Sequence, residues 1–403
     1  MGTTKAGGGY EVDHVSVWAL GHLVTRAGKD AHDFHGVFKN VADDSSEQGE
    51  GFLARIWPKL DEWKDNGERH IKKGAELAAR GGQEIYTAGN WYRDEDKRAE
   101  ALIDYQYWIG NDKRPIKYPN VDTVDDPDQA GRFEDAVDIN YQGISQSRNN
   151  LAGWPDKIEE DAEQILALGG TVGTFAAWIE MLTGKDIFAE AANAVVGDWR
   201  SLQRVAFAFS DAGNGFEDIA TNIDNGRFGI DRKGRWEGDA GDACKLWLAR
   251  YSTACTDLGA LLVGRYTAIK ALANAAYHLM QSIKHELAAT VDALLLLITR
   301  GRIAALQTGK TLAELIGKIA KALGRGKSIW DLSDGEDTVK ELIAIAVSIV
   351  DRVGAIRLLI SRLLAIAHEF ALLGSVSNAI GATIGAETVD EPNWPELYDH
   401  KGT

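Results

Sequence analysis

Two long stretches near the start of this sequence repeat apolar residues in alternating steps of three and four, and this pattern most limits what the chain can fold into. The first series is Val17, Leu20, Val24, Ala27, Ala31, Phe34, Phe38 and Val41. The second follows the polar residues 43–51 and comprises Ile56, Leu60, Trp63, Gly67, His70, Gly74, Leu77, Gly81, Ile85, Ala88 and Tyr92. Such spacing places the apolar residues on one narrow face of a helix. We therefore predict an antiparallel helical hairpin whose second arm continues to about residue 109.

Glycines recur seven residues apart on the second series, at Gly67, Gly74 and Gly81. Glycine inside a helix costs about 1 kcal/mol relative to alanine. A stripe of glycines on an apolar face is typical of helices whose backbones approach closely. We expect these three positions to mark such an approach.

The same spacing returns in the middle of the chain and predicts a second hairpin. Its first arm carries Trp199, Leu202, Ala206, Phe209, Gly213, Phe216, Ala220 and Ile223. Its second arm carries Cys244, Leu248, Tyr251, Cys255, Leu258, Leu262, Ile269, Leu272, Ala276, Leu279 and Ile283. The two cysteines lie about 16 Å apart along one helix, too far to form a disulfide with each other. On a buried face they are expected to pack as small apolar residues.

The remaining segments complete the predicted organisation of an elongated, all-α helical bundle. Residues 1–110 form the first hairpin, and a linker rich in Pro and Asp covers 111–135. Residues 136–290 contain shorter helices followed by the second hairpin. Hydrophobic C-terminal helices are expected over 291–386, and the two apolar stretches that predict them are 288–327 and 337–370. A polar tail over 387–403 closes the chain.

Composition excludes several classes of function. The 403 residues include 44 Lys and Arg against 60 Asp and Glu, a net charge of −16, and no basic cluster that would suit a nucleic acid. A hydrophobic content of 45% is ample for a packed core. The first residues lack the basic and apolar regions of a secretory signal peptide, and no uncharged apolar run is long enough for a membrane span.

The sequence also lacks the motifs of common enzyme sites. His32 and His35 lie one helical turn apart, yet a pair like this on a solvated face is usually idle. There is no HExxH, no GxSxG, and no glycine-rich loop with the lysine of a phosphate site. We therefore predict no catalytic residues, no metal and no cofactor, and a protein that is not an enzyme.

Two short motifs carry a resemblance to a known family. Trp236, Glu237 and Gly238 lie in the turn of the second hairpin, and small residues follow in the run WEGDAGDAC. This arrangement resembles the WXG superfamily of helical hairpins exported by type VII (ESX) secretion systems, and in particular the PPE-like half of EspB-like substrates of actinobacteria. Near the end of the first hairpin, Tyr92 and Asp96 in WYRDED match the YxxxD export motif of the PE-like half. Residues four apart lie on one helix face.

The resemblance implies a secreted, non-enzymatic protein. In EspB-like substrates a PE-like and a PPE-like hairpin are fused and pack side by side, which would bring the YxxxD end next to the WXG turn. The implied export signal is composite: Tyr92 and Asp96 together with Trp236 and Gly238. The implied partner is the secretion ATPase or a chaperone, and the implied location is outside the cytoplasm or at the cell surface, reached without a Sec signal peptide.

Other interpretations of the same residues stay open. Trp236 could serve only as a staple that packs the hairpin turn, and Tyr92 only as a residue of the helix seam. The apolar C-terminal helices leave room for a homo-oligomer, for a membrane contact, or for a pore-forming effector. The stretch that begins WIEMLTGKD also resembles the start of the trafficking modules of polymorphic toxins.

Overall fold

The computed structural model describes residues 12–43, 51–111, 133, 135–137, 139, 154–155, 157–171, 173–231, 235–308, 311–323, 337–372 and 395. In this part of the chain the secondary structure is helical, apart from one isolated bridge between Val12 and Trp236. The helices are α1 (His14–Asp43), α2 (Phe52–Asn111), α3 (Ile158–Thr171), α4 (Gly173–Thr183), α5 (Ile187–Val195), α6 (Trp199–Asp231), α7 (Asp239–Thr308), α8 (Leu312–Leu323) and α9 (Asp337–Ala371). The predicted all-α class is confirmed.

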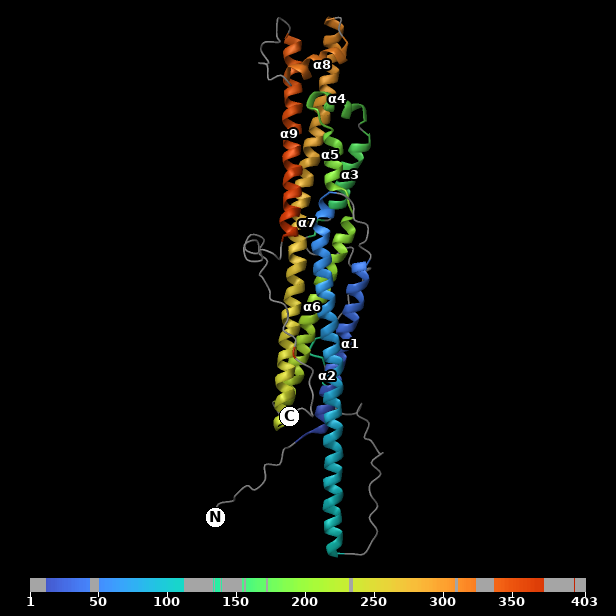
Figure 1. Cartoon of the computed structure of the whole chain (residues 1–403), viewed down its shortest axis with the longest axis vertical. Helices are drawn as coiled ribbons and strands as arrows, with labels where there is room; N and C mark the ends of the chain where they lie inside the picture. The colour runs from blue at the N-terminus through green and yellow to red at the C-terminus, as the bar shows by residue number, and fades with distance from the viewer. Residues whose placement is uncertain are drawn as a thin grey trace, which may run out of the picture.

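The helices form an elongated bundle around two long rods, α2 and α7 (Figure 1). Helix α1 packs along α2 and also contacts α6, while α6 packs along α7. Helix α9 adds a further layer because it runs beside α7 and reaches α2, and the short helices α3 to α5 cover the same half of the bundle. The arrangement is therefore larger than a pair of hairpins. The last part of α2 extends beyond the other helices at one end (Figure 1).

The closest approach of α1 and α2 does not occur at the predicted glycines. It occurs at Gly28, where an added Cβ would lie 2.7 Å from the backbone nitrogen of Ala79, and at Gly82, where it would lie 2.8 Å from the carbonyl oxygen of Gly21. These distances leave no space for a side chain. Helix α1 can lie close against α2 because both helices carry glycine where their backbones meet.

The predicted glycine stripe of α2 faces aromatic rings instead. A Cβ on Gly81 would lie 2.4 Å from the indole of Trp247, and the carbonyl of Gly74 accepts a 3.0 Å hydrogen bond from the buried hydroxyl of Tyr251. Gly67 lies against the ring of Phe38. Our expectation of close backbone approach at these positions was wrong. Regular spacing shows that the glycines share one helix face, but it does not show whether a backbone or an aromatic ring packs against that face.

Helix α7 is longer than the sequence pattern indicated. It continues to Thr308, through the position where the segment 288–327 was expected to begin, and α8 follows separately. The division expected at residues 290 and 291 thus falls within one helix. No glycine or proline lies between Ala288 and Thr299, so nothing in the local chemistry ends the helix there. None of the helices in the described residues is both long enough and apolar enough to cross a membrane.

Both cysteines lie on the buried face of α7, as predicted. Cys244 and Cys255 are fully buried and carry no disulfide. Burial raises the pKa of both thiols far above the ordinary value, because the charged thiolate loses its hydration. They therefore contribute packing volume to the core.

Helix α6 begins at Trp199, the first residue of the series that predicted this arm. Helix α5 ends at Val195, Gly197 takes a positive φ of 145°, and Asp198 caps the new helix. The Asp198 carboxylate accepts hydrogen bonds from the backbone N–H of Arg200 at 3.0 Å and from the hydroxyl of Ser201 at 2.6 Å. Partial burial raises the pKa of Asp198, but these bonds and the charge of Arg204 outweigh it, so the net pKa is lowered.

Removal of this cap should destabilise the protein in a pH-dependent way. We expect Asp198→Ala to lower the free energy of unfolding by about 1 kcal/mol at pH 7. Because the folded-state pKa lies below the ordinary value of 3.8, the stabilisation is present above that pH and is lost as the pH falls through the folded-state pKa. Urea denaturation at several pH values measures both effects. Asp198→Asn is the control, since asparagine caps helices without titrating; an equal loss in both variants at pH 7 would contradict the prediction.

Candidate recognition site

The turn before α7 is held by the residues that precede α1. Trp236 forms an antiparallel bridge with Val12, and the backbone N–H of Asp13 donates a 2.7 Å hydrogen bond to the carbonyl of Arg235. Asp13 also caps α1, because its carboxylate accepts a 2.6 Å hydrogen bond from the hydroxyl of Ser16. The start of the first helix and the turn between α6 and α7 are therefore tied together.

Glycines allow the chain to turn sharply behind Trp236. Gly238 has a φ of +96°, a conformation that residues with a side chain rarely adopt. At Gly241 an added Cβ would lie 2.5 Å from the carbonyl oxygen of Trp236, so the first turn of α7 passes directly over the tryptophan backbone. Glycine at these two positions therefore allows the sharp turn and the close approach of α7 to Trp236.

The side chain of Trp236 is completely buried. Its Nε1 has no hydrogen-bond partner among the described residues. A buried N–H without a partner costs free energy, so the packing of the ring must outweigh that cost. In this folded state the side chain of Trp236 packs the turn and is not accessible to a partner protein.

Tyr92 packs against this indole. The rings of Tyr92 and Trp236 lie 6.1 Å apart between centroids and nearly perpendicular, at 81°. This is the edge-to-face geometry that aromatic pairs favour. The two motifs found in the sequence, 144 positions apart, therefore meet in space at one end of the bundle.

Further aromatic and charged groups surround the pair. The centroids of the Trp91 and Tyr92 rings lie 5.0 Å apart, and Trp91 is 54% exposed. The guanidinium of Arg93 lies 5.3 Å from the centre of the Trp18 ring and forms a 3.0 Å ion pair with Asp94. The indole of Trp18 fits over Gly89, where an added Cβ would lie 2.5 Å from it.

Asp96 is exposed and has no hydrogen bond or ion pair with any other described residue. It lies one turn after Tyr92 on α2. Glu237, beside the buried Trp236, is also exposed. The accessible part of the site therefore includes Trp91, Asp96 and Glu237, together with the partly exposed Tyr92.

Sequence reasoning identified Tyr92, Asp96, Trp236 and Gly238 but missed Trp18, Trp91 and Arg93. The Trp18–Gly89 contact depends on the register of α1 against α2, which heptad spacing alone does not define. Trp91 directly precedes Tyr92 in the sequence, and a tryptophan beside the YxxxD motif was the signal that could have identified it.

The rest of the described structure offers little for chemistry. No group of three or more His, Cys, Asp and Glu side chains in the described ranges is placed to hold a metal ion. His35 lies 3.2 Å from Glu68, and its ring is 6.2 Å from that of His32. A surface pocket of about 430 Å³ lies between the start of α2, α5 and α9, where Glu190 and Arg357 form a 3.2 Å ion pair.

No protein-family model, no curated protein and no solved structure matches this chain.

Proposed function

We propose that this chain is a non-enzymatic, EspB-like substrate of a type VII (ESX) secretion system. The contact between Tyr92 and Trp236 is the observation that supports it most, because the two export motifs would need to lie together to be read as one signal. A bundle end with an exposed Trp91, and with a carboxylate at Asp96 that no described residue pairs with, is also suited to docking, since aromatic groups dominate such contacts.

The four proposed signal residues divide into two roles. Tyr92 and Asp96 would contact the secretion ATPase or a chaperone, because both have accessible surface. Trp236 and Gly238 would hold the turn on which Tyr92 rests, because the indole is buried and the glycine adopts a positive φ. The partner would then contact the surface of α2, while the turn with Trp236 and Gly238 would hold Tyr92 in position.

Asp96→Ala is the sharpest test of this proposal. An exposed carboxylate contributes little to stability, so helicity and melting should stay unchanged. Loss of a charged contact with a partner should reduce export at least about tenfold. The measurement is secretion of the full chain from a host that carries the matching system, with the cytoplasmic level and the circular dichroism of each variant recorded.

Glu76→Ala is the matched control because Glu76 is also an exposed acid on α2 and has no partner in the described residues. It lies about 30 Å from Asp96 along the helix. We expect Glu76→Ala to be exported normally. Normal export of the Asp96→Ala variant would reject the role of the YxxxD motif.

A specific observation favours a second candidate, a membrane-acting effector. Leu295, Leu296, Ile303 and Leu306 are exposed at 44% or more on one side of α7. Such a stripe could meet a lipid surface. Dye release from liposomes separates the candidates: an export substrate without membrane activity releases none, whereas leakage that disappears in Leu306→Ser would favour the effector.

A further inference from the structure

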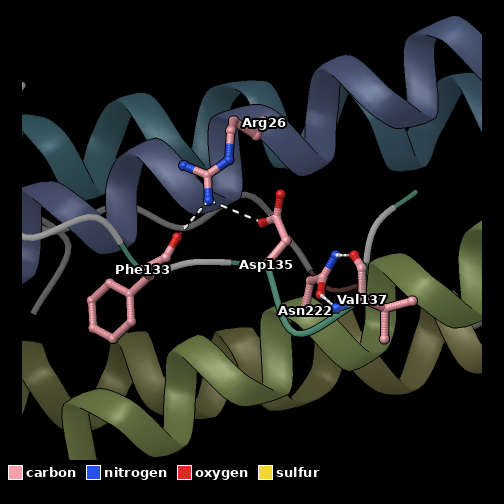
Figure 2. A network of polar contacts seen from close by, with 5 residues as sticks. All are labelled: Arg26, Phe133, Asp135, Val137 and Asn222. Carbon is pink, nitrogen blue, oxygen red and sulfur yellow. Dashed lines mark hydrogen bonds and ion pairs between the residues drawn. The ribbon is translucent and has the colours of Figure 1, made fainter. Parts of the chain in front are cut away.

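A short non-helical segment crosses between α1 and α6, where the expected linker over 111–135 meets the region 136–290. We call it the strap and define it as residues 133, 135–137 and 139. Figure 2 shows it between the α1 ribbon, which carries Arg26, and the α6 ribbon, which carries Asn222. Phe133 and Ile139 pack against the hydrophobic core.

Asn222 binds the backbone of the strap at Val137. Its side-chain nitrogen donates to the Val137 carbonyl at 3.0 Å, and its side-chain oxygen accepts from the Val137 N–H at 2.9 Å (Figure 2). This reciprocal pair reproduces the hydrogen bonds that a neighbouring β-strand would offer. Asn222 is only 3% exposed, so its amide is a buried polar group whose partner is the strap.

Arg26 and Gly229 add contacts at the other end of the strap. Arg26 donates to the Phe133 carbonyl at 2.7 Å and to the Asp135 carboxylate at 3.0 Å (Figure 2). The Phe133 ring lies against Gly229, where an added Cβ would be 2.5 Å from Cε1. The helices therefore offer space for an aromatic ring, a cation for an acid two residues later, and an amide for the backbone two residues after that.

We propose that the seam between α1 and α6 is a binding site for a non-helical peptide and that the strap is its resident ligand. The strap supplies no helix to the bundle, and its polar contacts are made to Arg26 on α1 and Asn222 on α6. Peptide recognition elsewhere uses the same combination of backbone hydrogen bonds and side-chain contacts. The strap is thus a separable latch between the first and second halves of the chain. This inference does not depend on the proposed export function.

The test supplies the ligand as a separate molecule. In the full chain, residues 133–139 are replaced by a Gly/Ser stretch of equal length, and a fluorescent peptide with the sequence of residues 131–141 is titrated in. We expect saturable binding with a dissociation constant on the order of 100 µM, measured by anisotropy. Asn222→Ala in this background should weaken binding at least about tenfold, because two hydrogen bonds are lost.

Thr221→Ala is the matched control because Thr221 is exposed on α6 next to Asn222. It should leave peptide binding unchanged. Failure of the peptide to bind a helical, cooperatively melting strap-replaced chain would overturn the proposal. Equal binding of a scrambled peptide, or no effect of Asn222→Ala, would also overturn it.

A second variant covers the case in which the replaced chain does not fold. Phe133→Ala combined with Asp135→Ala weakens the resident strap but leaves every helix residue intact. The peptide should then bind this double variant at least about tenfold more tightly than the unaltered chain, where the strap competes. Equal binding to both chains would contradict the proposed competition.

Discussion

Trp236→Ala is expected to lower the free energy of unfolding by about 3–5 kcal/mol, the range measured when a buried tryptophan is truncated. The ring is fully buried and lies against Tyr92, and its backbone is bridged to Val12. Alanine would leave a cavity beneath α2 that the tied turn cannot easily close. Urea denaturation followed by circular dichroism measures the loss.

Trp236→Phe separates the packing role of this residue from any recognition role. Phenylalanine keeps an aromatic ring against Tyr92 and removes the Nε1–H that has no partner in the described structure. We expect a cost below about 1.5 kcal/mol. Export should then be retained, because the buried indole is not itself a contact surface. Loss of export at unchanged stability would mean that the secretion system reads the indole from an opened state.

The same alanine substitution at two glycines of α1 should act in opposite directions. At Gly28 an added Cβ would meet the backbone of Ala79 at 2.7 Å, and neither helix backbone can move without disturbing its neighbours. We expect Gly28→Ala to lower the free energy of unfolding by about 1–3 kcal/mol. Thermal and urea denaturation both report this change.

Gly36→Ala is the matched control because Gly36 is exposed on the same helix and an added Cβ there meets nothing within 4 Å. It should raise the free energy of unfolding by about 0.5–1 kcal/mol, since alanine favours the helix more than glycine. If both variants lost stability equally, helix propensity or the unfolded state, not the contact with α2, would have to explain the result.

Local pattern predicted the helices well where the periodicity was long. The series that begin at Val17, Ile56, Trp199 and Cys244 correspond to α1, α2, α6 and α7. Boundaries were missed where the local pattern was ambiguous. The end of α7 at Thr308 falls inside the segment expected over 288–327, although Gly309, a residue type that often ends helices, follows it in the sequence.

The sequence by itself determined the helical class, the burial of Cys244 and Cys255 and the two motifs, because each depends on residues close together in the chain. Only the tertiary structure decided which glycines meet a backbone and which meet a ring, since that depends on the register between helices. It also decided that Trp236 is buried under Tyr92 while Asp96 remains exposed. Residues on one helix face share a direction, but what lies in that direction is set by elements far away in sequence.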